Sequence, residues 1–235
     1  MLNRIESYIT NNQDLVFKLF FVLVLLAYMH NMGVLALFAD EPTRSNVALE
    51  MILSDNYWVP TISGEFYYRK PPFYNWIVAG LYNVTGSYSE WVFRLPSIVP
   101  LALFGFTIYQ FFKKHFNQVV AFVGAAGFVS SVRFLVYAGL LGHIDIFYSW
   151  ITFIAFYIQI KAFKEQKWWA FFLLPYFIHS IGFLCKGLPS FLFAGITPVA
   201  LLLFHKEWKR LFDYRHFIGI AVFLIPIVAY FYQYA

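Results

Sequence analysis

Seven stretches of the sequence are each apolar and long enough to be read as membrane spans, and this feature constrains the fold more than any other. They cover residues 15–38, 95–112, 119–137, 144–160, 168–185, 188–204 and 217–234. A helix needs roughly 20 mainly apolar residues to cross about 30 Å of hydrocarbon. The sequence therefore predicts an all-α membrane protein of about seven transmembrane helices, with residues 1–235 forming a single transmembrane domain.

Composition and charge narrow the class of protein further. Hydrophobic residues make up 61% of the chain and charged residues only 12%, which excludes an ordinary water-soluble domain. The net charge of +5 does not indicate nucleic-acid binding, because no basic cluster lies on a polar domain. The single cysteine, Cys185, cannot form a disulfide within the chain.

The basic residues predict the orientation. With the N-terminus in the cytoplasm, the inside segments hold most of the Lys and Arg residues: Arg4, Lys18, Lys113, Lys114, Lys161, Lys164, Lys167, Lys206, Lys209, Arg210 and Arg215. This agrees with the positive-inside rule. The first apolar run exceeds the h-region of a signal peptide, so we expect it to stay as an anchor. The prediction is a multi-pass protein of the plasma membrane, which in a bacterium is the inner membrane.

One polar loop, residues 39–94, interrupts the apolar chain on the outer side. It contains half of the acidic residues: Asp40, Glu41, Glu50, Asp55, Glu65 and Glu90. This extracytoplasmic loop, which would be periplasmic in a bacterium, is where we expect the active site.

Two interfacial helices are predicted within this loop. The first runs from Asp40, as its N-cap, to about Ser54. Its membrane-facing side would hold Val47, Met51 and Ile52, and its solvent-facing side would hold Arg44, Asn46 and Glu50. Residues 65–70 should run extended into Pro71, and the second helix should cover residues 72–83.

Polar residues also lie at the outer ends of other spans. His143 and Asp145 precede the fourth span, and Lys186 follows the fifth. Charged groups near hydrocarbon usually face a cavity or a partner. Together with Asp40 and Lys70, they could surround one outward-facing site.

The order and spacing of the loop residues are more specific than their charge. The chain has Asp40-Glu41, Arg44, Glu50-Met51, Trp58-Val59-Pro60, Gly64, Tyr67, Lys70-Pro71-Pro72, Trp76 and Arg94-Leu95-Pro96. This pattern resembles the first outer loop of the polyprenyl-phosphate-dependent GT-C glycosyltransferases. The resemblance is to the 4-amino-4-deoxy-L-arabinose lipid A transferases and the dolichyl-phosphate-mannose protein mannosyltransferases, and it continues through Asp145 and residues 184–187.

The resemblance implies a membrane enzyme that moves a sugar from a polyprenyl-phosphate donor, such as undecaprenyl phosphate, to an extracytoplasmic acceptor: lipid A, a glycan or a protein. It implies that Asp40 is the catalytic carboxylate and that Lys70 and Tyr67 hold the donor phosphate. We add Glu41 and Asp145 to the catalytic residues and Lys186 to the phosphate ligands, with Arg44, Arg94 and His143 in support.

Each of these residues also has an ordinary structural explanation. Asp40 and Asp145 can cap helices, and Glu41 can stabilise the first turn of its helix. Lys70 and Lys186 can reach lipid headgroups. Arg44 and Arg94 can form loop salt bridges, and His143 can hydrogen-bond a helix end.

Two further alternatives stay open. No His, Cys and carboxylate spacing predicts a zinc site, so we expect no metal ligands and no required cofactor, while a divalent-cation requirement is left open.

The resembling family carries further spans, whereas this sequence ends in a hydrophobic run. The alternative function is therefore a non-catalytic lipid-carrier-binding or assembly subunit that works with a partner chain.

Overall fold

The structure, a computed structural model, describes residues 12–30, 32–134, 136–137 and 141–233. Arg4, which contributed to the predicted charge bias, and the end of the last predicted span at residue 234 lie outside these residues. The chain forms two compact units. Unit 1 comprises Met1–Ala39 and Tyr88–His143, and unit 2 comprises Asp40–Ser87 and Ile144–Ala235.

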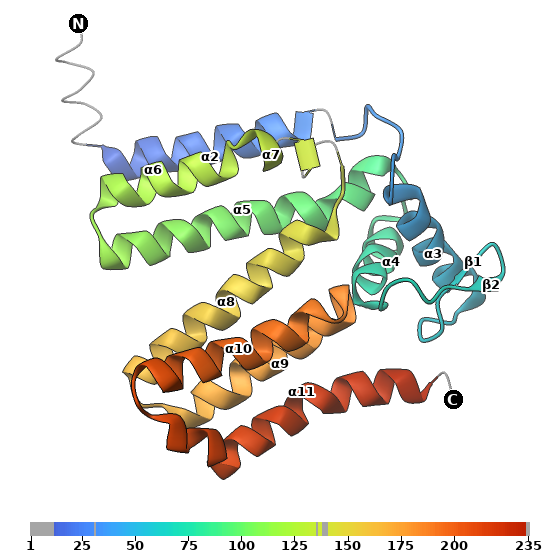
Figure 1. Cartoon of the computed structure of the whole chain (residues 1–235). Helices are drawn as coiled ribbons and strands as arrows, with labels where there is room; N and C mark the ends of the chain where they lie inside the picture. Colours follow the sequence, from blue (N-terminus) through green and yellow to red (C-terminus); the bar gives the residue numbers. More distant parts are fainter. Residues whose placement is uncertain (1–11, 31, 135, 138–140, 234–235) are drawn as a thin grey trace, which may run out of the picture. The chain divides into compact units, whose positions relative to one another are not determined.

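The described residues are almost entirely helical (Figure 1). Unit 1 contains α2 (Gln13–His30), α5 (Glu90–His115), α6 (Gln118–Val129) and α7 (Val132–Phe134). Unit 2 contains α3 (Glu41–Ser54), β1 (Thr61–Ile62), β2 (Glu65–Phe66), α4 (Phe73–Thr85), α8 (Ile144–Lys164), α9 (Trp168–Lys186), α10 (Pro189–Phe204), the 3-10 helix η2 (Trp208–Phe212) and α11 (Tyr214–Tyr232). The two strands form an antiparallel hairpin that pairs Thr61 with Phe66 and Ile62 with Glu65.

Five of the described helices are long and apolar enough to cross a membrane: α2, α5, α8, α9 and α11. The other two predicted spans correspond to the shorter apolar helices α6 and α10. Two predicted boundaries were wrong. The first helix ends at His30, well before residue 38, and α6 ends at Val129, where Ser130 and the short α7 interrupt the run predicted to reach residue 137.

Unit 1 is organised around α5, against which α2 and α6 pack (Figure 1). Gly105 of α5 permits the contact with α6, because a Cβ there would lie only 2.4 Å from Cγ1 of Val129. The hydroxyl of Tyr28 on α2 donates a hydrogen bond of 2.6 Å to the carbonyl oxygen of Val129. Because no water competes for such a bond inside a bilayer, it fixes these ends of α2 and α6 to one another.

Arg94 holds the segment that follows α2. Its side chain is fully buried and donates hydrogen bonds to the carbonyl oxygens of Met32, Leu35 at 3.0 Å and Ala36 at 3.3 Å. These carbonyl groups lie in an irregular segment, so no helical hydrogen bonds satisfy them, and the guanidinium supplies the missing donors. Arg94 ties this segment to the beginning of α5 by these bonds.

In unit 2, α9 is the central helix and packs against α8, α10 and α11 (Figure 1). The core between them is mainly aromatic and includes Phe171, Phe172, Tyr176, Phe183, Phe223 and Tyr230. Helix α11 approaches α9 most closely at Gly219. A Cβ at this position would lie 2.6 Å from Cδ2 of Tyr176 and 3.0 Å from the carbonyl oxygen of Phe172.

We expect Gly219→Ala to destabilise unit 2 by about 1–3 kcal/mol, because the added methyl group forces α11 away from a backbone carbonyl that cannot move independently. Gly195→Ala on α10 is the matched control, since a Cβ there has no heavy atom within 4 Å. Alanine favours helix, so the control should be neutral or stabilising by up to about 1 kcal/mol. Thermal unfolding of the purified variants in detergent tests this; equal midpoints for the two variants would contradict it.

Candidate functional site

The predicted carboxylate Asp40 lies at the N-terminus of α3 and is exposed. Helix α3 begins at Glu41 and ends at Ser54, as predicted. The prediction that the Asp40 side chain caps this helix was wrong: its backbone is helical, with φ −81° and ψ −12°, and its side chain makes no cap hydrogen bond. The carboxylate therefore does not satisfy the end of its own helix.

One face of α3 is buried in unit 2 and carries charge. Glu41 is 2% exposed and Arg44 is 4% exposed, so the prediction that Arg44 stays in water was wrong. The guanidinium of Arg44 lies over the ring of Tyr74 on α4, 5.5 Å from its centroid. Planar guanidinium groups pack favourably on aromatic faces. The pairing of α3 with α4 explains why a charged residue can be buried here.

Val47 and Met51 were predicted to face the membrane, and this was also wrong. They are buried with Tyr67 in a small core under the hairpin, to which Ile62 and Trp76 add partly buried side chains. Segment 40–87 thus has a hydrophobic core of its own. It consists of two helices packed together and a hairpin packed against α3, which is a more rigid support for polar residues than a loop.

Glu50 organises the turn of the hairpin. Its carboxylate accepts hydrogen bonds from the Thr61 hydroxyl at 2.6 Å, from the Ser63 amide and from the Gly64 amide at 3.4 Å. Desolvation acts to raise the pKa of Glu50, but the three hydrogen bonds together outweigh it and lower the pKa. Ser63 and Gly64 both have positive φ, at 54° and 79°, and the carboxylate holds the amides of this tight turn.

Tyr67 and Lys70 follow the hairpin. Tyr67 is 6% exposed, and its amide donates a 2.8 Å hydrogen bond to the carbonyl oxygen of Pro60. Burial raises the pKa of the Tyr67 hydroxyl, while Arg44 opposes this and Asp40 adds to it. Asp40 and Arg44 are thus both close enough to Tyr67 to act on its hydroxyl electrostatically.

Lys70 is half-buried and lies two residues before Pro72, the N-cap of α4. No hydrogen bond or ion pair joins it to another described residue. The N-terminus of a helix carries a partial positive charge from unpaired N–H groups, so Lys70 and the first turn of α4 together favour an anion.

Asp145 and Lys186 form a pair, although they were predicted to have separate roles. The Lys186 ammonium forms an ion pair with the Asp145 carboxylate and lies 5.4 Å from the centroid of the Tyr148 ring. The Lys186 side chain is 31% exposed and that of Asp145 is 53% exposed. Near this pair, Phe147 of α8 stacks on Phe73 of α4, with ring centroids 6.2 Å apart. The beginning of α8 and the beginning of α4 are therefore neighbours.

Asn75 of α4 is a candidate site residue that was not predicted from the sequence. It is fully buried, and neither its Oδ1 nor its Nδ2 finds a hydrogen-bond partner among the described residues; the same holds for Nη1 of Arg44. Buried polar atoms are nearly always bonded in native proteins. A signal was present in the sequence, because Asn75 is a polar residue flanked by Phe73, Tyr74, Trp76 and Ile77.

Arg44 also connects α3 with the end of α9. It acts electrostatically on Cys185, the residue that directly precedes Lys186. Seven predicted site residues, Asp40, Glu41, Arg44, Tyr67, Lys70, Asp145 and Lys186, share unit 2 with Asn75. The group combines an exposed carboxylate, cationic side chains and unsatisfied buried donors.

The other two predicted supporting residues belong to unit 1. Arg94 binds the backbone carbonyls described above. The carbonyl oxygen of His143 accepts a 2.9 Å hydrogen bond from the Ser97 hydroxyl, and its ring lies 5.5 Å from that of Tyr137. Among the residues that the structure describes, no three or more His, Cys, Asp and Glu side chains gather in a group that could hold a metal ion.

Comparison with known proteins identifies similar sequences. The sequence profile of the dolichyl-phosphate-mannose-protein mannosyltransferase family matches residues 69–232, well over half of the chain. The chain is 26% identical over 218 residues to undecaprenyl phosphate-alpha-4-amino-4-deoxy-L-arabinose arabinosyl transferase 1 of Proteus mirabilis (strain HI4320). That alignment covers 90% of this chain and 38% of the relative, so the chain spans about two fifths of the relative's length.

Two solved structures have the same fold. ArnT from Cupriavidus metallidurans in the apo state superposes with a TM-score of 0.74 at 20% identity, over 92% of this chain and 41% of ArnT. The same protein bound to undecaprenyl phosphate gives a TM-score of 0.67 at 18% identity, over 92% of this chain and 40% of that one. The predicted GT-C fold is thereby confirmed for this portion.

We expect the hairpin turn to become less stable in acid. The pKa of Glu50 is lowered because its hydrogen bonds stabilise the ionised carboxylate, so they stabilise the folded turn only while Glu50 is ionised. The stabilisation should be fully present above the ordinary Glu value of 4.5 and should be lost as the pH falls through the lowered pKa. Hydrogen exchange of residues 61–66, corrected for the intrinsic rate at each pH, measures this.

The control is Glu50→Gln, which keeps the size of the side chain and removes its titration. Its hairpin should exchange faster than wild type at neutral pH and should lack the acid transition. If the wild-type protein and Glu50→Gln show the same pH profile, Glu50 does not hold the turn.

Proposed function

Because this integral membrane chain belongs to the dolichyl-phosphate-mannose-protein mannosyltransferase family, we propose that it is a glycosyltransferase that takes a sugar from a polyprenyl-phosphate donor. One observation supports the proposal: residues widely separated in the sequence, from Asp40 to Lys186, belong to the same compact unit, which has an exposed carboxylate and positively charged side chains. The support for an undecaprenyl-phosphate carrier is the name of the Proteus relative and the lipid bound to the solved ArnT.

In the proposed reaction, the bond between the sugar's anomeric carbon and the phosphate oxygen breaks, and the polyprenyl phosphate leaves with the bonding electrons. Lys70 and the first turn of α4 would neutralise the leaving phosphate, with Tyr67 and Lys186 as further ligands. A new bond forms between the anomeric carbon and an acceptor oxygen or nitrogen. The acceptor's proton passes to a carboxylate, for which Asp40 is the first candidate and Glu41 and Asp145 are further candidates in unit 2.

We propose further that the N-terminus is cytoplasmic and that segment 40–87 faces the outer side of the plasma membrane, which is the periplasm in a bacterium. The acceptor would then be lipid A, another glycan or a protein on that side. No cofactor is needed in this scheme, because lysine supplies the charge that stabilises the phosphate.

A second function is a carrier-binding subunit that does not transfer sugar by itself. One observation favours it: the Asp145 carboxylate, proposed to assist the acceptor, is already paired with Lys186. Such a chain would keep the phosphate site and would need a partner chain for chemistry.

Asp40→Asn should lower sugar transfer by at least about 100-fold while leaving carrier binding intact, because it removes the base and keeps the shape of the side chain. Asp55→Asn is the matched control: it makes the same change at the other end of α3, at an exposed residue with φ 52°, a backbone conformation that asparagine tolerates. Transfer is measured with purified protein in nanodiscs and an undecaprenyl-phosphate-linked sugar. Unchanged transfer by Asp40→Asn would refute the catalytic assignment.

Lys70→Ala should weaken the binding of undecaprenyl phosphate by about 10- to 100-fold, the effect of losing one charge-assisted hydrogen bond. The control is Lys164→Ala, the loss of an exposed lysine at the C-terminus of α8. Titration followed by native mass spectrometry gives both affinities. If wild type binds the carrier through Lys70 but transfers no sugar, the carrier-binding subunit is the correct function; if Lys70→Ala binds normally, the phosphate site lies elsewhere.

A further inference from the structure

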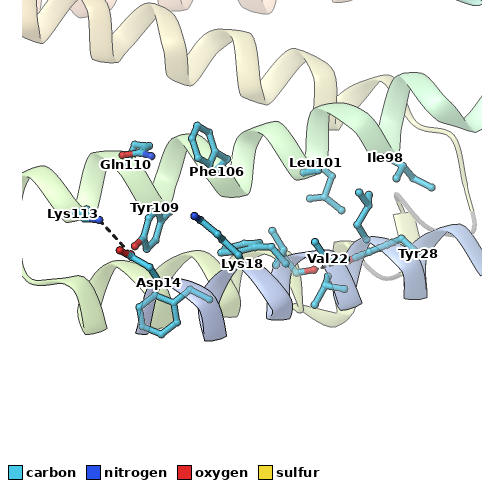
Figure 2. Close-up of a pocket in the computed structure, with 16 residues that line it drawn as sticks. Asp14, Lys18, Val22, Tyr28, Ile98, Leu101, Phe106, Tyr109, Gln110 and Lys113 are labelled. Atoms are coloured by element: carbon cyan, nitrogen blue, oxygen red, sulfur yellow. Dashed lines mark hydrogen bonds and ion pairs between the residues drawn. The ribbon is translucent and has the colours of Figure 1, made fainter. Parts of the chain in front are cut away.

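An apolar crevice runs between α2 and α5 within unit 1 (Figure 2), and none of its lining residues is among those proposed to act on the donor. Its volume is about 460 Å³. One wall is a single face of α2 from Asp14 to Tyr28, and the other is a single face of α5 from Ile98 to Lys113. The lining along most of this length is aromatic and aliphatic, including Phe17, Phe21, Leu101 and Phe106.

The two ends of the crevice differ in chemistry. At one end, Tyr28 is buried and bonded to Val129, which closes the crevice. At the other end lie Asp14, Lys18, Gln110 and Lys113, the polar residues of the mouth. This end is where α2 begins and α5 ends, so it is the end expected nearest to a membrane surface.

The charges at the mouth leave one lysine without an anion. Asp14 is 3.5 Å from the Lys113 ammonium and also accepts a hydrogen bond from the Gln118 amide, so these groups satisfy one another. Lys18 forms no ion pair or hydrogen bond within the described ranges, and Figure 2 shows its side chain directed toward α5 across the crevice. It lies five residues inside α2, or about 7 Å along the helix axis.

An unpaired ammonium at this depth is costly in hydrocarbon unless an anion or water reaches it. The phosphate of a membrane lipid is at the right level, because long lysine side chains extend to the headgroup region. Anionic lipids are favoured over zwitterionic ones, since the mouth has a net positive charge once Asp14 and Lys113 are paired.

The length of the crevice suits a lipid chain. From Asp14 to Tyr28 it extends about 21 Å, more than the roughly 15 Å of hydrocarbon in one leaflet. An acyl chain of one leaflet therefore fits along the apolar faces of α2 and α5.

We infer that this crevice binds an anionic phospholipid, with the lipid phosphate at Lys18 and one acyl chain along the apolar faces of α2 and α5. The lipid would fill the space that the packing of α2 against α5 leaves open, and it would neutralise the lysine that the chain leaves unpaired. The crevice shares no residue with the proposed donor site, and the inference does not depend on transferase activity.

The inference is tested by native mass spectrometry of the purified full chain after exchange with phosphatidylglycerol or phosphatidylcholine of identical acyl chains. Wild type should retain phosphatidylglycerol about fivefold more tightly, the preference that about one lysine confers. Lys18→Ala should abolish the preference, and Lys18→Arg should keep it and show that the fold tolerates substitution at this position.

Two more variants separate this site from general surface charge and from another occupant. Lys114→Ala removes an exposed lysine at the same end of α5 that does not line the crevice, and it should keep the preference. Ala102→Phe, or Ala102→Leu if the larger residue prevents folding, narrows the crevice and should reduce retention of both lipids.

Three results would overturn the inference. The first is equal retention of the two lipids by wild type. The second is a loss of preference in Lys114→Ala as large as in Lys18→Ala, which indicates surface charge alone. The third is undiminished lipid binding by the Ala102 variant, which means that the chain lies elsewhere and that another occupant, such as a further helix, covers the crevice.

Discussion

The hydrocarbon of a bilayer offers no partner to a backbone N–H or C=O group, and the rest of this structure depends on that constraint. It explains why the described spans are helices, and why an irregular stretch such as residues 32–36 is supplied with donors by a buried arginine, Arg94. It also makes charge expensive within the spans. Seven of the nine site residues predicted from the sequence lie in segment 40–87 or at the ends of α8 and α9, all of which belong to unit 2.

Segment 40–87 is folded as a support for function. A stretch this long could have been a flexible connection, but Val47, Met51 and Tyr67 give it a core, and Glu50 fixes the turn of its hairpin. Arg44 is buried between α3 and α4 while Asp40, one turn earlier, stays exposed. The catalytic role proposed for Asp40 needs a well-placed backbone and access to substrate, and this arrangement provides both.

A lipid has a different proposed role in each of the two units. In unit 2 it is the proposed substrate carrier, recognised through its phosphate by groups near the beginning of α4. In unit 1 it is the proposed filler of a crevice, recognised by a lysine inside the first span. Both proposals use the same physics: an anion meets a cation whose surroundings provide few competing partners, while an apolar tail follows an apolar surface.

Hydropathy and motif spacing determined the helical membrane class, most span positions, both helices of segment 40–87 and the family, because apolar length and local turn chemistry are properties of the sequence alone. The tertiary structure decided which face of each helix is covered. The burial of Arg44, Val47 and Met51, the pairing of Asp145 with Lys186 and the unsatisfied Asn75 all depend on residues distant in the sequence. Helical periodicity states which residues share a face, but only packing decides whether water, lipid or protein lies against it.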